Sequence, residues 1–215
     1  MSMQFPVRLA WTTIAVLGLG SAQTAAAEPA AKFEVGAFGS WRLGGEFRAD
    51  ADTPTERDVD LESGDAWGLN FGLYRDPDSF YELLYSYQST GLDPDDFGPG
   101  APDISVEYYH FGGTVLFGDD PRVRSYVSLT AGAARFKADG YGSETDLSAS
   151  LGTGFRMPVT ANFTIDLGVR AYITFIDQDT RLFCTSINGQ GGCLLESTGS
   201  AVFQAEASAG FRWRF

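Results

Sequence analysis

The feature that most constrains this chain is an alternation of apolar and polar residues that recurs in eight segments. The clearest segment has apolar side chains at every odd position from Phe163 to Phe175. Between them stand Thr164, Asp166, Gly168, Arg170, Tyr172 and Thr174. A period of two is the pattern of a β-strand with one apolar face, because successive side chains point to opposite sides of a strand. We therefore expect an all-β fold.

The other alternating segments show how the strands are joined. They are expected over residues 33–47, 67–74, 81–88, 109–117, 123–136, 147–156 and 203–215. Short turns at 75–79, 118–122 and 158–162 alternate with longer loops at 49–65, 90–103, 137–146 and 177–199. Most segments reach the ~9–11 residues that a tilted strand needs to cross a bilayer. This arrangement predicts an eight-stranded antiparallel up-and-down transmembrane β-barrel with its turns and termini in the periplasm.

The first 27 residues have the features of a secretory signal peptide. Arg8 precedes an apolar stretch from Leu9 to Leu19, and Ala25, Ala26 and Ala27 provide small residues for cleavage. Residues 28–215 then form the mature barrel domain. An N-terminal membrane anchor is the alternative, although the stretch is short for a spanning helix. We expect export through this cleaved segment and location in the bacterial outer membrane.

The composition excludes several classes of protein. The chain has 17 Phe, 9 Tyr and 4 Trp, which is far more aromatic content than a disordered chain carries. No apolar run beyond the N-terminus approaches the ~20 residues of a spanning helix. With 15 Lys and Arg against 28 Asp and Glu, the net charge is -13, so no nucleic-acid partner is expected.

Alternation alone does not decide which face points inward, because a soluble barrel or sandwich would bury its apolar face. Three features favour an apolar face that points outward. The first is glycine on the polar face, since a narrow interior needs small residues beside large ones. These glycines are Gly36, Gly44, Gly68, Gly72, Gly152, Gly154, Gly168 and Gly210. The second is the presence of both charge signs on that face. The third is an expected interfacial belt of Trp41, Trp67, Tyr81, Trp213 and Phe215.

Charged residues on the polar face are predicted to pair with one another inside the barrel. The predicted network consists of Glu34, Arg42, Glu46, Glu82, Asp166, Arg170, Glu206, Arg212 and Arg214. Phe38, Tyr74 and Tyr172 also fall on the inward face. Side chains normally fill the interior of a barrel of this size, so we expect a closed polar lumen. A narrow channel for small solutes is the alternative.

The C-terminal sequence Phe211-Arg212-Trp213-Arg214-Phe215 resembles the signature of bacterial outer-membrane barrels, which end in an aromatic residue preceded by alternate aromatics. From about residue 32 to 215 the chain resembles the small eight-stranded outer-membrane β-barrel family, with its OmpA-like, OmpX-like and OmpW-like members. The stretch 108–114 and the loop from Cys184 to Cys193 resemble uncharacterised proteobacterial members. The resemblance implies that Phe211, Trp213 and Phe215 form a signal read by the barrel-assembly machinery. It implies no defined activity.

Two sets of residues could carry chemistry. Cys184 and Cys193 lie in the last long loop, and in an exported protein they are predicted to form a disulfide. A redox or metal-binding pair is the alternative, but no other Cys and no nearby His complete such a site. His110 is the single histidine, and no Ser stands two residues later, as the pattern of a lipid A deacylase requires. We predict that His110 is a hydrogen-bonded lumen residue, with a lipid A-modifying enzyme as the alternative.

The predicted loops are acidic. The first contains Asp50, Asp52, Glu56, Asp58, Asp60, Glu62 and Asp65, and the second contains Asp93, Asp95, Asp96 and Asp103. These carboxylates form a solvated surface or, alternatively, share divalent cations with lipopolysaccharide phosphates. We predict no catalytic residue, no cofactor and no metal site. The expected function is that of a monomeric, non-enzymatic envelope barrel with outer-membrane lipid and lipopolysaccharide as partners.

Overall fold

The computed structural model describes residues 33–49, 57–91, 103–140, 142–176, 181–187, 190–196 and 201–215. For residues 46–49, 57–60, 181–187 and 190–196 the description covers the backbone. The predicted signal peptide, residues 1–27, lies outside these ranges.

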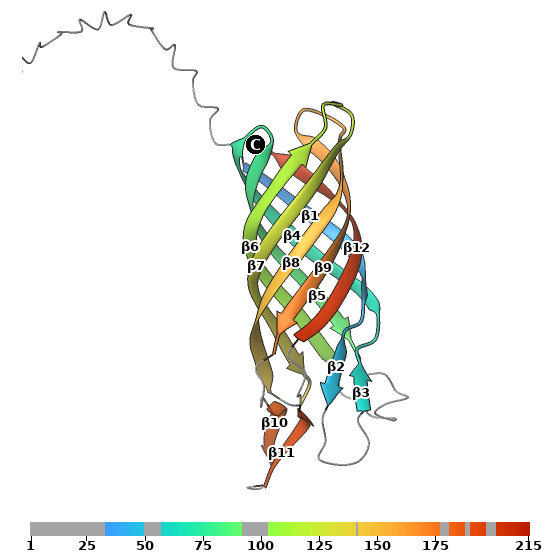
Figure 1. The fold of residues 1–215 in the computed structure, drawn as a ribbon, viewed down its shortest axis with the longest axis vertical. Coiled ribbons are helices and arrows are strands. Elements are labelled where there is room, and N and C mark those ends of the chain that lie inside the picture. Colours follow the sequence, from blue (N-terminus) through green and yellow to red (C-terminus); the bar gives the residue numbers. More distant parts are fainter. Residues whose placement is uncertain are drawn as a thin grey trace, which may run out of the picture.

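Eight strands form a closed barrel, as the alternation predicts (Figure 1). They are β1 (Phe33–Leu43), β4 (Gly64–Asp76), β5 (Ser79–Thr90), β6 (Ile104–Phe117), β7 (Arg124–Ala138), β8 (Ser143–Pro158), β9 (Phe163–Phe175) and β12 (Ala201–Arg214). Every neighbouring pair is antiparallel, and the order is β1-β12-β9-β8-β7-β6-β5-β4. Pairing of β1 with both β4 and β12 closes the ring. The predicted fold class is confirmed.

Four shorter strands lie outside the barrel sheet. β2 (Glu46–Ala49) pairs with β3 (Arg57–Asp60), and β10 (Arg181–Ile187) pairs with β11 (Gln190–Glu196). Both hairpins occupy one end of the barrel, whereas the short turns and the chain end at Phe215 occupy the other (Figure 1). We call these the loop end and the turn end. No helix within the described ranges is long and apolar enough to cross a membrane.

Several predicted boundaries are wrong. The fourth strand begins at Ile104, five residues before the predicted start at Tyr109. The first strand ends at Leu43 and does not continue to Phe47, because the backbone turns away at Gly44. A Cβ on Gly44 would lie 1.7 Å from the carbonyl oxygen of Leu61, so the two chain segments approach too closely for a side chain. The third long loop is also shorter than predicted, since β7 runs to Ala138 and β8 begins at Ser143.

The apolar faces of the strands point outward. On β9, Leu167 and Val169 are 43% and 55% exposed, whereas Asp166 and Arg170 are each 8% exposed. A soluble barrel would have the reverse arrangement, with its apolar side chains inside. The barrel strands are 11 to 16 residues long, and a tilted strand needs about 9–11 to cross a bilayer. The wall is therefore long enough to extend beyond the hydrocarbon region.

Inward-facing glycines lie where large side chains cross the interior. A Cβ on Gly168 would be 2.2 Å from the hydroxyl oxygen of Tyr126, and one on Gly68 would be 2.3 Å from the ring of Phe38. No side chain fits at either position. These glycines allow aromatic residues to lie across the barrel and fill its centre.

Candidate functional site

Among the described residues, the interior of the barrel holds buried charges of both signs in equal number. Each of these side chains belongs to a residue that is at most 8% exposed. The four bases are Arg42, Arg156, Arg170 and Arg212, and the four acids are Glu34, Glu82, Asp166 and Glu206. A buried charge is costly unless it is paired and hydrogen-bonded, so the equal number is a condition for this interior to be stable.

Arg212 connects three of the four acids. Its Nε lies 2.8 Å from Oδ2 of Asp166, and its Nη1 lies 3.1 Å from Oε1 of Glu34. Its Nη2 lies 3.6 Å from Oε1 of Glu82. Arg156 pairs with the same oxygen of Glu34, and its Nε is 3.4 Å from Asp166. These contacts make one continuous network, so removal of any member leaves others uncompensated.

Aromatic residues complete the network at the turn end. The Tyr74 hydroxyl donates a hydrogen bond of 2.8 Å to Oε2 of Glu34, and Arg214 donates to the Tyr74 oxygen. The guanidinium carbon of Arg156 lies 4.9 Å from the centroid of the Phe80 ring. The turn end of the interior is therefore occupied by aromatic rings and guanidinium groups.

Glu82 lies at the centre and is fully buried. The hydroxyls of Thr114 and Ser128 donate to its Oε2, the latter at 3.0 Å. Its Oε1 is 3.5 Å from Nη2 of Arg170. Both carboxylate oxygens thus have partners, as an ionised group out of water requires.

A second ionic centre lies nearer the loop end. Nη2 of Arg42 is 2.9 Å from Oε2 of Glu206, and the Tyr172 hydroxyl donates to Oε1 of Glu206 at 2.7 Å. The Arg42 guanidinium carbon is 5.0 Å from the ring centroids of both Tyr108 and Tyr172. The Tyr108 hydroxyl donates to Oε1 of Gln204 at 2.7 Å. Two stacked tyrosines and an arginine therefore cross the barrel at this level.

His110 lies between the two centres and is 2% exposed. Its Nδ1 is 3.0 Å from the Thr130 hydroxyl and 3.4 Å from the Ser150 hydroxyl. Arg170 donates to the Ser150 oxygen at 2.9 Å. A histidine beside a serine is the arrangement of an activated nucleophile. Here both residues are enclosed by the barrel wall, since Ser150 is 3% exposed.

The interior changes character at the loop end, where it becomes apolar. A cluster of inward-facing side chains there is buried to 5% exposure or less: Leu61, Ile104, Val106, Phe136, Ala138, Ile176 and Val202. Leu61 comes from the segment before β4, and its N–H donates to the Gly45 carbonyl at 3.0 Å. The next N–H, of Glu62, donates to the Gly91 carbonyl at 3.0 Å. This segment is held across the barrel mouth from both sides.

In the sequence, this transition is marked by an exchange of polar and apolar residues between the inward and outward positions. Along β6 the inward positions are even, and they change from His110 to Val106 and Ile104. The outward positions change in the opposite sense, from Phe111 to Ser105. On β7 the same exchange puts Phe136 and Ala138 inside and Lys137 outside. The loop end of these strands therefore has the polarity of a soluble barrel.

The structure brings most of the predicted network together, with two exceptions and one addition. Glu46 does not continue β1 as predicted, because it falls in β2, which pairs with β3 outside the barrel sheet. Arg214 lies at the rim, with its side chain 35% exposed and 4.0 Å from Glu34. Arg156 was missing from the prediction, although it continues the series of inward even positions on β8. In the register it stands opposite Asp166, which is one of the two acids it pairs with, the other being Glu34.

The remaining predicted site residues are the two cysteines of the β10·β11 hairpin and the three aromatic residues at the end of the chain. Cys184 stands directly opposite Cys193 in the β10·β11 register. Opposed residues of antiparallel strands have Cα atoms about 4.5–5.5 Å apart, a separation that a disulfide can span. The bond itself stays a prediction, because these side chains lie outside the description. Phe211, Trp213 and Phe215 are about half exposed or more, on the outward face of β12.

Three solved structures share the fold. Neisserial surface protein A is 16% identical with a TM-score of 0.55, and the match covers 85% of this chain and 97% of that one. Outer membrane protein AlkL, determined by solid-state NMR in DMPC bilayers, is 10% identical with a TM-score of 0.56, covering 100% and 97%. OprG from Pseudomonas aeruginosa is 14% identical with a TM-score of 0.53, covering 86% and 96%. These likenesses concern the fold.

No curated protein matches this sequence. The sequence profile of one family, described as the outer membrane protein beta-barrel domain, matches residues 12–215. That range includes all eight strands of the barrel and every buried charge described above. The chain therefore belongs to the outer membrane protein beta-barrel family and is an integral protein of the bacterial outer membrane.

Proposed function

We propose that this protein is a closed barrel with a structural or interaction role at the cell envelope, and that it neither conducts solutes nor catalyses a reaction. The observation that supports a closed interior is its continuous filling from the turn end to the loop end. Rings and guanidinium groups occupy the turn end, paired charges occupy the middle, and apolar side chains occupy the mouth. A conducting pore would need an aqueous path past all three.

A space left between the side chains of the middle region is small. A cavity of about 20 Å³ lies beside Asn70, Tyr126, Asp166, Arg170 and Ser208. A volume of roughly 10–15 Å³ on this scale holds one water molecule. The cavity is therefore suited to about one bound water and is too small for a solute.

An enzymatic role is the weaker alternative. A lipid-modifying barrel must present its nucleophile to a substrate in the membrane, whereas His110 and Ser150 face inward and are 2% and 3% exposed. Their hydrogen bonds to Thr130 and Arg170 fit a role in satisfying buried polar groups.

The interaction role rests on the loop end. Two hairpins extend there, and the described acidic residues Glu62, Asp65 and Asp103 are exposed. Carboxylates at this position would repel other anionic surfaces or share divalent cations with lipopolysaccharide phosphates. Cationic and aromatic residues on the outer wall favour a more specific partner, an anionic lipid.

Conductance tests the closed interior directly. We expect purified, refolded protein in a planar bilayer to show no steady single-channel current. The triple variant Arg42→Ala, Tyr108→Ala and Tyr172→Ala removes one level of side chains that cross the barrel. It leaves the turn end and the mouth filled, so it too should show no steady current. Steady, large conductance of the unmodified protein would overturn the proposal.

Cell experiments test the location and the absence of catalysis. A folded barrel is expected in the outer-membrane fraction and should change its gel mobility on boiling. Lipid A isolated from cells that express the His110→Ala variant should have the same mass spectrum as lipid A from cells with the unmodified protein. A difference between the two spectra would favour the enzymatic alternative.

A further inference from the structure

We infer that the outer wall of β5, β6 and β7 binds a phosphorylated glycolipid of the outer leaflet, of the lipid A type. Its phosphate would lie at Arg135 and Lys137, and its acyl chains would occupy the groove next to them on the membrane side. The inference rests on the proposed function, because it requires the loop end of the barrel to lie at the outer leaflet. It adds a definite position and a chemical class of partner.

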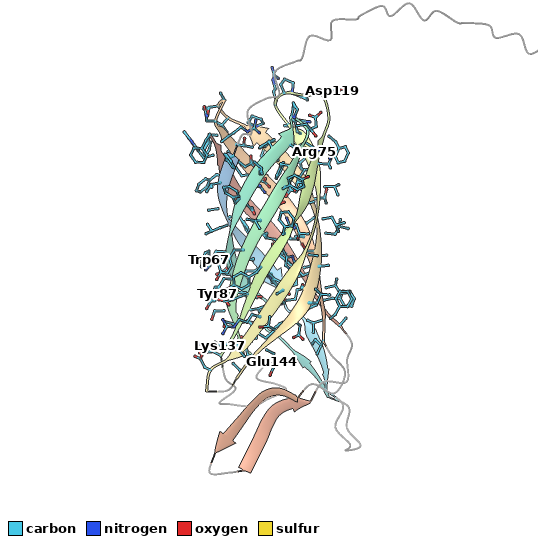
Figure 2. The ribbon with its side chains drawn as sticks, turned by 90° about the vertical axis from the view of Figure 1, so that its left-hand side faces the viewer. Trp67, Arg75, Tyr87, Asp119, Lys137 and Glu144 are labelled. Atoms are coloured by element: carbon cyan, nitrogen blue, oxygen red, sulfur yellow. The ribbon has the colours of Figure 1, made fainter. Side chains whose placement is uncertain are left out.

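The first observation is a pair of exposed bases at the loop end. Arg135 and Lys137 occupy successive outward positions of β7. Within the described barrel strands they are the basic residues that point outward at this end, since Arg75 lies at the turn end. Figure 2 shows Trp67, Tyr87 and Lys137 following one another along the wall toward the loop end, with Arg75 at the opposite end. The two bases are thus placed just beyond an aromatic belt.

The belt indicates where the membrane surface lies. The ring of Trp67 is 5.6 Å from that of Tyr85 and 5.9 Å from that of Tyr87, and the rings of Tyr85 and Tyr109 are 5.1 Å apart. Tryptophan and tyrosine collect at the level of lipid headgroups, because their rings are apolar and their hydroxyl or N–H groups are polar. Arg135 stands opposite Glu107, one outward position beyond Tyr109 toward the loop end, which places it beside the headgroup level that the belt marks.

The second, independent observation is an apolar groove on the membrane side of these bases. It has a volume of about 510 Å³ and is open to the surface of the barrel. Its lining includes Leu69, Leu83, Tyr85, Tyr109, Phe111 and Ala131. The small side chain of Ala131 lies opposite Phe111 in the register and leaves the hollow between the larger residues. A groove of this volume and apolar lining fits hydrocarbon chains.

The contacts that the two bases already make are weak and exposed. Arg135 donates a hydrogen bond of 3.4 Å to the Ser143 hydroxyl. Lys137 is 4.0 Å from Asp139, and the two side chains are 57% and 74% exposed, so water screens this pair. Glu107 stands opposite Arg135 in the register. Its carboxylate already accepts hydrogen bonds from Tyr85 at 3.4 Å and Tyr109 at 3.1 Å. A guanidinium group binds phosphate oxygens with parallel N–H bonds, which favours phosphate as the partner of Arg135.

A second groove on the opposite wall provides a contrast. It has about 670 Å³ and is lined by residues that include Trp41, Leu43, Ala171, Ala205 and Ala207. The outward positions next to it at the loop end, within the described residues, are apolar. It can hold hydrocarbon but offers no cation, so the phosphorylated lipid should select the first groove.

Binding of bisphosphorylated lipid A to the refolded barrel in detergent micelles, followed by native mass spectrometry, tests the inference. The double variant Arg135→Ala and Lys137→Ala should bind roughly tenfold less, given the attraction of each base to an anionic lipid surface. Ala131→Phe fills the groove and should lower binding several-fold. Arg75→Ala is the matched control for the bases and Ala207→Phe for the groove, and both should bind as the unmodified protein does.

Three results would overturn the inference: undiminished binding by the double variant, an equal loss with Arg75→Ala, or equal binding of phosphatidylcholine. Each variant is first required to show the heat-dependent gel shift of a folded barrel. Conductance of the unmodified protein would refute the closed-barrel proposal but would not affect the inference of a lipid site on the outer wall. Binding that ignores Arg135 and Lys137 in a non-conducting barrel would refute this one alone.

Discussion

The interior of this barrel is filled in two different ways, although the same strands supply both parts. From the turn end to the level of Glu206 the interior contains paired charges. From Val106 toward the loop end, at Ile104 and Phe136, the inward side chains are apolar. The outward side chains of β6 and β7 change from apolar to polar toward the loop end. Where lipid covers the outside, the apolar residues are needed there and the polar ones are left to pair within. Where water covers the outside, the usual arrangement of a soluble protein returns.

The two regions should therefore respond differently to substitution, and the charged region should be the more sensitive. Glu82→Leu leaves Arg170 and Arg212 without their shared acid inside the barrel. Removal of one partner from a buried pair costs about 3–5 kcal/mol of unfolding free energy. Urea unfolding in micelles, followed by tryptophan fluorescence, measures this loss. Glu82→Gln keeps the shape and the acceptor for Ser128 and should lose less; equal stability of Glu82→Leu and the unmodified protein would contradict the network.

A cavity in the apolar region should cost somewhat less. Phe136→Ala removes a buried ring from the mouth cluster, and a change of this kind costs about 3 kcal/mol. The same unfolding measurement applies. Ser105→Ala, an outward position at the same level of the barrel, should change stability by less than about 0.5 kcal/mol. If both variants had the same stability, the mouth would not be a packed core.

A paired replacement sharpens the comparison, because it converts part of the charged region into the apolar kind. Arg42→Met alone and Glu206→Met alone should each cost about 3 kcal/mol, since each leaves an uncompensated buried charge. The double variant should recover to within about 1 kcal/mol of the unmodified protein, because both charges are then absent. Additive losses in the double variant would mean that the two side chains have no coupling energy, and would contradict their pairing.

The hairpin beyond the barrel should matter least to the barrel's stability. Non-reducing peptide mapping is expected to find Cys184 linked to Cys193. Because β10 and β11 pair with each other outside the barrel sheet, Cys184→Ser should change the unfolding free energy of the barrel by less than about 0.5 kcal/mol. Its effect should be confined to the hairpin, where limited proteolysis is expected to become faster. Two free thiols in the unmodified protein would refute the bridge.

The alternation predicts the eight strands and the two faces of each, because a period of two has one physical meaning in a strand. Which face points inward had to be inferred from the glycines and the charges of both signs on the polar face. Inward positions such as Asp166 and Arg170 follow from counting along β9. The ion-pair partners do not follow from this count. Arg212 pairs with three acids on three other strands, and alternation does not show which side chains meet across the barrel. The apolar mouth was missed for a different reason. In residues 104–107 the inward positions are apolar and the outward positions are polar, the reverse of the rest of β6. A search for one apolar outward face therefore ends the strand too early.

The seam between β1 and β12 has a consequence for how such a protein reaches its membrane. The register runs from Glu34 opposite Arg214 to Leu43 opposite Ala205, so the two strands that close the ring are the most distant in sequence. Until β12 has emerged, every partial chain is an open sheet with two bare edges and an apolar outer face. Such a chain would aggregate in water. A barrel with this seam is therefore expected to fold only once its last strand can pair with its first inside lipid.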